Sequence, residues 1–366
     1  MANKALAAVL VEERKIELQE FDVPKVNSNS GLLRVEATGI CGSDWSQYRG
    51  ELQAWGVKFP IIPGHEVLGH IEEIGEEAAK RWRVNKEDRV IVEAKIPCGR
   101  CAECLAGSYI NCDVHISYGL YLSTTVPPSL WGGYGQYMFL HPNSMVHKIS
   151  PHVPAEQAVL FMAIGNGIRW ASQVPGTQIG DTVVIHGPGQ HGLGCVIGAK
   201  EAGASCIIVA GLTADAKRLA LAKELGADFT IDVQKEDLIE TVRAITNGRM
   251  VNVAIDVSEG ATEPVTASVD LVRKRGTIVL AGLKHSKPVN GLISDRIIMK
   301  QLTIKGVYTH DFRAVEPAIH LIESGKYPFH KMCSHKFPLD QAEIALKTVG
   351  RQMSGEDPIH VTIAVE

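Results

Sequence analysis

Short apolar runs alternate with segments of helical periodicity through the second half of the chain. The runs are almost continuously apolar, which is typical of strands buried on both faces of a parallel sheet. Helices that cover the two faces of such a sheet account for the segments between the runs. The pattern predicts a doubly wound α/β domain whose strands lie at residues 183–185, 206–209, 229–231, 253–257 and 277–281.

The first part of the chain has shorter runs. Residues 1–154 contain strand-like segments, such as 32–37 and 89–93, that are separated by Gly, Pro and Asn. The apolar start, 5–11, ends at Glu12, so it is too short for a bilayer span and lacks the cleavage site of a signal peptide. We interpret it as the first strand of a compact β-rich domain.

Three glycines follow the strand at 183–185. Gly187, Gly189 and Gly192 stand in the arrangement Gly-x-Gly-x-x-Gly, and a helix-compatible segment follows at 193–202. Strand, turn and helix in this order are typical of a dinucleotide-binding unit, in which glycines let the backbone approach a pyrophosphate at a helix N-terminus. We expect the cofactor to contact Gly187, Gly189, Gln190, His191, Gly192 and Leu193.

Proline residues interrupt the chain after about residue 302, at Pro317, Pro328, Pro338 and Pro358. A helix that begins near Pro154 marks the start of the alternating region. We therefore expect residues 1–154 and 302–366 to form one discontinuous domain, with the nucleotide-binding domain, 155–301, inserted into it.

The end of the second predicted strand bears on the choice between NAD and NADP. An acid normally stands there in NAD-selective domains, but this chain has Gly211. The glycine leaves room for a phosphate, and Lys217 and Arg218 would supply charge. Asp215 would instead reach the ribose, or it would stabilise the first turn of the next helix through the helix dipole. NAD and NADP remain equally open.

Four cysteines crowd one short segment. Cys98, Cys101, Cys104 and Cys112 are separated by two, two and seven residues. Four thiolates from one loop can close a tetrahedron around zinc and leave no open position for a substrate, so the spacing predicts a structural zinc site. Buried, unrelated cysteines are the alternative.

Composition narrows the classes of partner. The 366 residues are 45% hydrophobic and 21% charged, with a formal net charge of -4. This balance argues against binding to nucleic acid or to an anionic membrane, since either needs a basic surface. Eight cysteines without a secretion signal indicate metal ligands or free thiols in a reducing cytoplasm.

Several motifs in register give the chain a family resemblance. They are Gly39-Ile-Cys-Gly-Ser-Asp44, Gly64-His-Glu-Val-Leu-Gly69, the four-cysteine segment, Gly132-Gly-Tyr-Gly-Gln-Tyr137 and the glycine turn. In this order the chain resembles the zinc-containing medium-chain alcohol dehydrogenases, most closely the threonine and sorbitol dehydrogenase branch, over essentially its whole length. The resemblance implies a GroES-like catalytic domain, a Rossmann domain, an active site in the cleft between them, a small-molecule substrate and a homodimer or homotetramer.

The resemblance also implies a catalytic zinc. The family uses zinc as a Lewis acid that makes the alcohol proton acidic, so that hydride passes to the nicotinamide. Cys41 and His65 fall at ligand positions, and Ser43 falls where a hydroxyl relays the alcohol proton. Asp44 falls where a carboxylate orients the histidine, although Ser and Asp are also common turn residues.

Two residues depart from the family pattern. Met162 stands where the family has a third ligand, Cys, Glu or Asp, and a thioether binds zinc poorly. We hypothesise that Glu66 is the third protein ligand, with water as the fourth; weak or absent zinc is the alternative. Ser46 replaces a histidine that passes the proton to solvent, so a water chain must substitute.

The sequence thus predicts a zinc-dependent NAD(P) oxidoreductase that interconverts a secondary alcohol and a ketone. Trp45, Tyr48, Trp55 and Trp131 would wall a pocket for a bulky or apolar substrate, or they would be packing residues. Two alternatives remain. In the first, an enzyme of the same fold uses bound nicotinamide for C=C reduction, or for a transient-redox elimination or ring-opening reaction. In the second, the chain is a non-catalytic nucleotide-binding protein.

Overall fold

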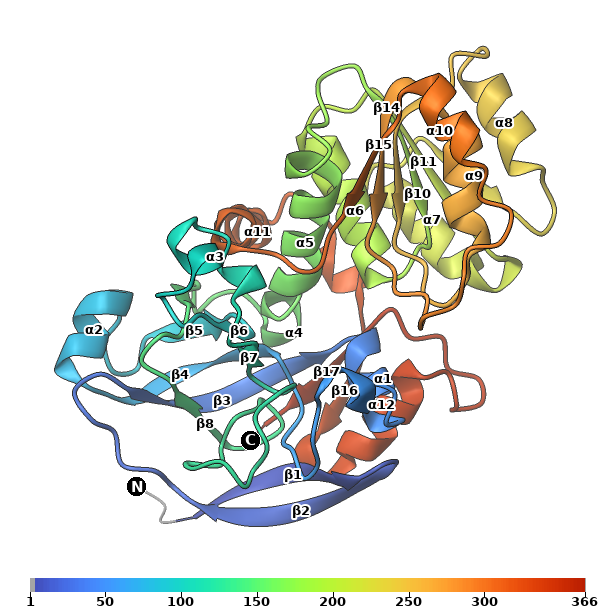
Figure 1. The fold of residues 1–366 in the computed structure, drawn as a ribbon. Coiled ribbons are helices and arrows are strands. Elements are labelled where there is room, and N and C mark those ends of the chain that lie inside the picture. Colours follow the sequence, from blue (N-terminus) through green and yellow to red (C-terminus); the bar gives the residue numbers. More distant parts are fainter. Residues whose placement is uncertain (1–3, 366) are drawn as a thin grey trace. The chain divides into compact units, whose positions relative to one another are not determined.

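The chain forms two compact units in the computed structural model, which describes residues 4–365 (Figure 1). The first unit comprises Met1–Phe161 and Ile319–Glu366, and the second comprises Met162–Ala318. The second unit is therefore inserted into the first. Its limits differ from the predicted 155–301 because α4 (Ala155–Ala158) packs on β3 (Gly31–Ile40) of the first unit, whereas β15 (Thr303–Gly306) completes the sheet of the second.

A seven-stranded sheet is the frame of the first unit. The C-terminal strand β17 (His360–Ala364) pairs with β3, which returns the end of the chain to the first domain. The path of the sheet runs β16 (Cys333–Pro338), β17, β3, β4 (Glu66–Ile74), β5 (Arg89–Val92) and β9 (Val146–Lys148), with β8 (Tyr137–Leu140) also on β3. Two further pairs are β1 (Lys4–Glu12) with β2 (Lys15–Asp22) and β6 (Lys95–Ile96) with β7 (Ile116–Ser117).

The predicted strands of the first unit are confirmed. The apolar start forms β1, and the runs at 32–37 and 89–93 lie in or overlap β3 and β5. The inward-facing apolar side chains form one core, and it includes the fully buried residues Leu10, Leu33, Ile61 and Tyr134. Burying such side chains is the main favourable contribution to the fold of this unit.

The second unit contains a six-stranded sheet in which every neighbouring pair is parallel. Five of its strands were predicted, and each is confirmed with small changes at its ends. The sixth, β15, was not predicted. The order is β12 (Phe229–Asp232), β11 (Cys206–Gly211), β10 (Thr182–His186), β13 (Val251–Asp256), β14 (Val272–Leu280) and β15.

Helices flank this sheet on both faces (Figure 1). None of the helices in residues 4–365 combines the length and apolar character needed to cross a bilayer. The second unit has α5 (Phe161–Ile168), α6 (Gln190–Glu201), α7 (Ala216–Glu224), α8 (Leu238–Ile245), α9 (Glu263–Leu271) and α10 (Ser294–Lys300). The helices elsewhere are α1 (Gly42–Tyr48), α2 (Glu76–Trp82), α3 (Ala102–Leu105), α11 (Phe312–Ser324), which spans the boundary, and α12 (Ala342–Val349).

Glycines bring α5 and α6 into backbone contact. A Cβ added to Gly194 would lie 2.1 Å from the carbonyl oxygen of Ala163, and one added to Gly198 would lie 2.3 Å from that of Gly167. A side chain at either position would force the helices apart. The contact fixes α6, and with it the glycine turn that precedes the helix.

Candidate metal centres and dinucleotide-binding turn

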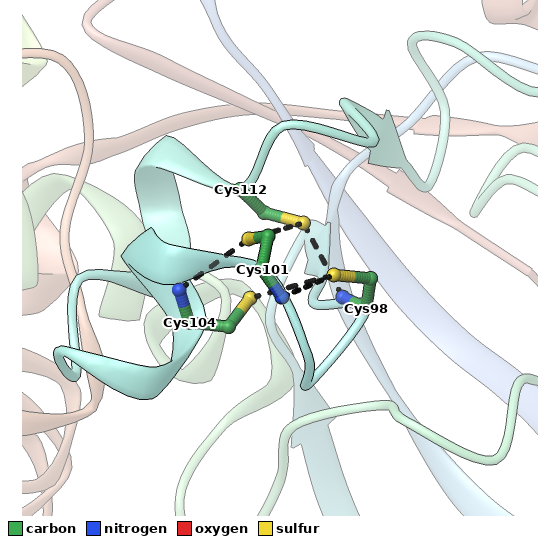
Figure 2. A group of neighbouring side chains, drawn as sticks. All are labelled: Cys98, Cys101, Cys104 and Cys112. Carbon is green, nitrogen blue, oxygen red and sulfur yellow. Dashed lines mark hydrogen bonds between the residues drawn. The ribbon is translucent and has the colours of Figure 1, made fainter.

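The four cysteine side chains converge in one lobe of the first unit (Figure 2). Their sulfur atoms all lie within 4.8 Å of one another, and the Sγ atoms of Cys98 and Cys104, like those of Cys101 and Cys112, are 4.0 Å apart. Tetrahedral zinc with bonds of about 2.3 Å places its ligand sulfurs about 3.8 Å apart. The structure therefore brings together the four predicted ligands at a spacing that fits zinc.

Backbone amides support thiolates in this lobe. Cys98 N–H donates to Cys112 Sγ at 3.3 Å, and Cys101 N–H donates to Cys98 Sγ at 3.4 Å. Amide hydrogen bonds, chiefly from Arg100 and Cys101, lower the pKa of Cys98; for Cys112, burial raises the pKa but amide hydrogen bonds outweigh it. Donors of this kind favour the ionised form, which is the form that binds a metal.

A buried polar chain attaches the cysteine lobe to the sheet. Tyr109, between the third and fourth cysteines, donates its hydroxyl proton to Glu93 at 2.6 Å. The other oxygen of Glu93 lies 2.8 Å from Nε2 of His147 on β9. Glu93 and His147 are both nearly fully buried. The lobe is thus held by side chains outside its own loop.

A second cluster in the first unit comprises Cys41, His65 and Glu66. One potential ligand atom from each lies within 4.8 Å of the other two, and all three residues are buried. Cys41 precedes α1, and His65 immediately precedes β4. Cys41 Sγ lies 3.1 Å from His65 Nε2. The three residues that were hypothesised as ligands are therefore adjacent in space.

Ser43 and Asp44 complete this cluster. Ser43 Oγ is 2.6 Å from Cys41 Sγ and 3.2 Å from His65 Nε2. Asp44 Oδ1 lies 3.2 Å from His65 Nδ1, and Oδ2 accepts a hydrogen bond from Cys41 N–H at 2.9 Å. Asp44 thus lies beside Nδ1 while Nε2 faces Cys41 and Ser43, an arrangement in which a carboxylate can orient a ligating histidine.

The electrostatic environment of Cys41, His65 and Glu66 favours the binding of a cation. Burial raises the pKa of Cys41. Burial lowers the pKa of His65, but the charges of Asp44 and Cys41 outweigh it and raise the pKa well above its usual value. One oxygen of Glu66, Oε1, is buried without a hydrogen-bond partner among the described residues. The raised pKa values favour the protonated forms of Cys41 and His65, and a bound cation would displace these protons. Deprotonated Cys41 and His65, together with the unpartnered carboxylate oxygen, form a donor set that fits zinc.

The two departures from the family pattern lie in different units. Met162 is 4% exposed and begins the second unit, in α5. Ser46 is 2% exposed in α1, which does not fit a group that hands a proton directly to solvent. The expectation that a water chain replaces the histidine is not tested by the structure.

The aromatic residues considered as pocket walls are mainly packing residues. Trp131 and Tyr48 are 4% and 2% exposed and belong to the core of the first unit. Trp45 stacks on Tyr48 with ring centroids 5.5 Å apart, and a Cβ on Gly350 would lie 2.4 Å from its ring. Trp55 is 44% exposed. The packing interpretation is correct for Trp131 and Tyr48, because each is enclosed by other apolar side chains.

The glycine turn has the geometry that the spacing predicts. Gly187 has φ 97°, a conformation that disfavours other residues. A Cβ on Gly192 would lie 1.9 Å from the carbonyl oxygen of Gly187, so the turn closes only with glycine there. A Cβ on Gly189 would meet nothing within 4 Å. Gly189 also precedes α6 without any side-chain cap, so the helix N-terminus is available to a phosphate.

Three residues beside the turn differ in what they offer a cofactor. Gln190 is 8% exposed, and its Oε1 has no hydrogen-bond partner among the described residues. His191 Nδ1 lies 3.4 Å from Asn166 Nδ2. The centroid of its ring lies 5.3 Å from that of Trp170. The prediction that Leu193 contacts the cofactor needs correction. Its side chain is fully buried, and its N–H donates to the carbonyl oxygen of Gly189 at 2.9 Å, so neither group is free to contact a cofactor.

The end of β11 lies against the glycine turn. A Cβ on Gly211 would lie 2.9 Å from Cγ of Pro188, so a larger residue at this position would meet the turn, and the room predicted for a phosphate stays a prediction. Asp215 is 8% exposed; it accepts hydrogen bonds from Leu212 N–H at 3.1 Å and from Arg218 at 2.9 Å. These contacts favour a local structural role for Asp215.

Two polar groups in the second unit were not found from the sequence. Asn166 Oδ1 lies 3.2 Å from His310 Nδ1, which links α5 to the segment before α11. Lys284 lies 2.8 Å from buried Asp256 at the carboxyl ends of β14 and β13. Asn and Lys at isolated positions carry no sequence signal of such contacts, because the partners are brought together only by the fold.

Known proteins match both units. Residues 27–151 match the alcohol dehydrogenase GroES-like domain, and residues 192–324 match the zinc-binding dehydrogenase domain. A probable alcohol dehydrogenase of Mycobacterium tuberculosis is 38% identical over 98% of this chain and 99% of its own length. The erythritol/L-threitol dehydrogenase of Mycolicibacterium smegmatis is 32% identical over 99% and 98%. An alcohol dehydrogenase structure from Thermotoga maritima is 25% identical, with a TM-score of 0.89 and full coverage of both chains.

The fold and these matches define a two-domain dehydrogenase of the zinc-binding kind. The chain belongs to the zinc-containing medium-chain alcohol dehydrogenase family. It is accordingly an NAD(P)-dependent enzyme with a GroES-like domain and a Rossmann-like parallel-sheet domain, and both the fold class and the family resemblance are confirmed.

Proposed function

We propose that the enzyme interconverts a secondary alcohol and a ketone at a zinc ion held by Cys41, His65 and Glu66. The adjacency of these three buried residues, with one potential ligand atom from each within 4.8 Å of the others, is the observation that supports this assignment. A zinc ion bound there supplies a Lewis acid that makes the proton of an alcohol more acidic. Three protein ligands leave the fourth position for water or substrate.

The neighbouring residues then have distinct tasks. Asp44 orients His65 through its contact with Nδ1, at 3.2 Å. Ser43 Oγ, 3.2 Å from His65 Nε2, is placed to relay the alcohol proton: it accepts that proton as its own hydroxyl proton passes to water. Because Ser46 is enclosed, the proton must leave Ser43 through water rather than through Ser46.

The second unit binds the cofactor in this proposal. The turn at Gly187, Gly189 and Gly192 and the N-terminus of α6 receive the pyrophosphate, with Gln190 and His191 beside it. Asp215 and Arg218 remain candidates for the ribose end only if their 2.9 Å ion pair rearranges. The pair neither provides a free acid for NAD nor a free guanidinium for NADP, so we propose that either nicotinamide is accepted.

The four-cysteine lobe is proposed to hold a second, structural zinc. Its sulfur spacing fits a closed tetrahedral shell, which has no position for a substrate. All eight cysteines are free of disulfide bonds, so the four of the lobe are available as ligands.

The exact alcohol is a separate proposal. Bulky, apolar substrates were suggested by aromatic residues, of which Trp131 and Tyr48 are now placed in the core. Polyols therefore enter beside apolar alcohols as candidate substrates, and the relative from Mycolicibacterium smegmatis is named for two of them.

We also propose a homo-oligomer that forms through the edge of the second unit's sheet. The four residues of β15 are exposed, and the strand ends the sheet. Ile304 of this strand is 42% exposed, and Ile298 and Met299 of α10, the element that precedes it in the chain, are 68% and 77% exposed. An exposed strand edge with apolar neighbours favours pairing with the same edge of a second copy. Light scattering of the purified chain tests this, and a monomer at working concentrations contradicts it.

The function is tested with the purified, zinc-loaded protein. A panel of secondary alcohols and polyols is offered with NAD or NADP, and the reduced cofactor is measured against the ketone formed. One reduced cofactor for each ketone supports the proposal. Product formation without net change in the cofactor would indicate transient redox chemistry, and cofactor binding without turnover on the panel would contradict the assigned reaction.

A further inference from the structure

A partly buried lysine and a buried aspartate join the ends of two strands in the second unit. Asp256 ends β13 and is 1% exposed, whereas Lys284 follows β14 with a side chain that is 13% exposed. Lys284 Nζ lies 2.8 Å from Asp256 Oδ2. It also donates to the backbone carbonyl of Ser258 at 2.6 Å and to the hydroxyl of Ser258 at 3.2 Å. The ammonium of Lys284 thus forms an ion pair with Asp256 and donates two hydrogen bonds to Ser258. Asp256 Oδ1 in turn accepts hydrogen bonds from the N–H and the hydroxyl of Ser258, at 3.0 and 2.5 Å.

Backbone contacts hold the segments that follow β13 and β14 against each other. Both Ala281 and Gly282 donate an N–H to the carbonyl oxygen of Asp256 at 2.9 Å. A Cβ on Gly282 would lie 2.0 Å from the carbonyl oxygen of Ser258, so this approach is possible only for glycine. The carbonyl that Lys284 holds is therefore the same one against which the neighbouring loop packs.

The segment that follows β13 packs directly against the glycine turn. Val257 N–H donates to the carbonyl of His186, the residue before Gly187, at 3.1 Å. A Cβ on Gly187 would lie 3.2 Å from Ser258 N, and one on Gly192 would lie 3.4 Å from Cγ2 of Val257. Ligands of open parallel sheets bind at the carboxyl ends of the strands, where these contacts occur.

We propose that Lys284 is a positioning residue for the dinucleotide. It holds Ser258, and through Ser258 the segment 257–260, against the glycine turn before the cofactor binds. Its ammonium is already engaged by Asp256 and Ser258, so it acts through the loop rather than by contact with a phosphate. Preorganisation of this kind improves affinity because fewer groups must be ordered on binding. The inference rests on the proposed function only in requiring that the second unit binds a nicotinamide dinucleotide.

The first test compares cofactor affinity in two variants of the full chain. The Kd for NADH and NADPH is measured by fluorescence for wild type, Lys284→Met and Lys287→Met. Lys287 is the matched control, because its Nζ donates to Gly260 at 3.2 Å in the same loop pair but at an exposed position. We expect Lys284→Met to raise Kd about tenfold or more, and Lys287→Met to leave it within about twofold. Equal affinity of wild type and Lys284→Met overturns the inference, whereas a wild type that binds neither cofactor contradicts the proposed function instead.

A double variant separates positioning from charge balance. Lys284→Met leaves the buried carboxylate of Asp256 without its cation, which by itself destabilises the unit. Asp256→Asn combined with Lys284→Met removes both charges, whereas the asparagine Oδ1 can still accept from Ser258 N–H and Oγ as Asp256 Oδ1 does. We therefore expect the melting temperature to recover while the cofactor Kd stays raised, because the Ser258 carbonyl has lost the ammonium that held it. Recovery of Kd together with the melting temperature would show that Lys284 only neutralises Asp256. The double variant also gives the answer if the single variant fails to fold.

Discussion

His360 donates a hydrogen bond to Glu66, with Nε2 3.1 Å from Oε2 and both side chains fully buried. A Cβ on Gly39 would lie 2.0 Å from the same oxygen, so the glycine provides the space for this contact. The other oxygen of Glu66 has no hydrogen-bond partner among the described residues. The carboxylate is therefore oriented through one oxygen and keeps the other for a cation beside Cys41 and His65.

Replacement of Glu66 tests whether it is the third zinc ligand. Glu66→Gln keeps the shape of the side chain but removes the charge, and a neutral amide is a poorer partner for zinc than a carboxylate. We expect the zinc content to fall from two equivalents per chain to one, and kcat/KM to fall by about two orders of magnitude. Elemental analysis and steady-state kinetics measure both. Glu73→Gln, on the same strand, is the control, and two tightly bound zinc ions in Glu66→Gln would exclude Glu66 as a ligand.

Replacement of His360 tests a residue that acts on the metal only through Glu66. His360→Gln removes the ring that orients the carboxylate, and changes at such supporting residues typically weaken metal binding by about 10- to 100-fold. Competition with a chelator, followed as zinc release, measures the affinity of the Cys41 site. His335→Gln is the control, because His335 lies on the neighbouring strand β16 and pairs with the exposed Glu356, away from Glu66. Identical release curves for wild type and His360→Gln would contradict this role.

The cysteine lobe is expected to be stable only with its metal. Cys104→Ser removes one of four ligands, and structural zinc sites supply much of the folding free energy of such loops. We expect loss of one zinc equivalent, cleavage by protease within residues 98–112, and retention of the zinc at Cys41. Cys206→Ser, which lies in β11, controls for the loss of a thiol elsewhere. A protease-resistant lobe without zinc would show that the Tyr109–Glu93–His147 chain suffices to hold it.

Features that depend on local pattern were predicted from the sequence. The five apolar strands were found because a strand buried on both faces is apolar at successive positions. The strand β15 was missed because its residues, Thr-Ile-Lys-Gly, are all exposed at the sheet edge and form no apolar run. The four-cysteine lobe was found because its ligands lie within one short segment.

Features that depend on distant partners were not predicted. His360 reaches Glu66 across 294 positions of sequence, and no local pattern connects the two residues. Gly211 was interpreted as space for a phosphate, and its close approach to Pro188 was not foreseen. A steric contact between the glycine turn and the end of β11 therefore explains why no acid stands at that position. The sequence of a single strand does not show this contact.

Two glycines of the turn are expected to respond differently to alanine. Gly192→Ala would place its Cβ 1.9 Å from the Gly187 carbonyl, so we expect the turn to be distorted and the second unit to unfold at lower temperature. Gly189→Ala meets nothing within 4 Å, so we expect wild-type stability but weaker binding of the dinucleotide, because the methyl group occupies the face left open for phosphate. Calorimetry and cofactor titration measure the two effects. Unchanged cofactor affinity in Gly189→Ala would contradict pyrophosphate binding at this face.

An ion pair in the first unit predicts how stability depends on pH. Arg89 donates to both oxygens of Glu36, at 2.7 and 2.9 Å, and also to the carbonyls of Ser150 and Val153. Burial raises the pKa of Glu36, but Arg89 and His70 outweigh it and hold the pKa below its usual value. Because the folded pKa is the lower one, this stabilisation is fully present above the unfolded pKa of about 4.3 and is lost as the pH falls through the folded value.

Arg89→Met should therefore destabilise the first unit most at neutral pH. We expect a loss of about 3 kcal/mol in the free energy of unfolding at pH 7, which shrinks as the pH is lowered from about 5 to 3 because wild type loses the same contribution there. Urea unfolding at several pH values measures the difference between the two proteins. Arg34→Met is the control: Arg34 lies 3.4 Å from Glu72 with a side chain that is 45% exposed, so its loss should cost less than about 1 kcal/mol and vary little with pH. A difference between Arg89→Met and wild type that stays constant from pH 7 to 3 would show that Arg89 stabilises the fold through the two carbonyls alone.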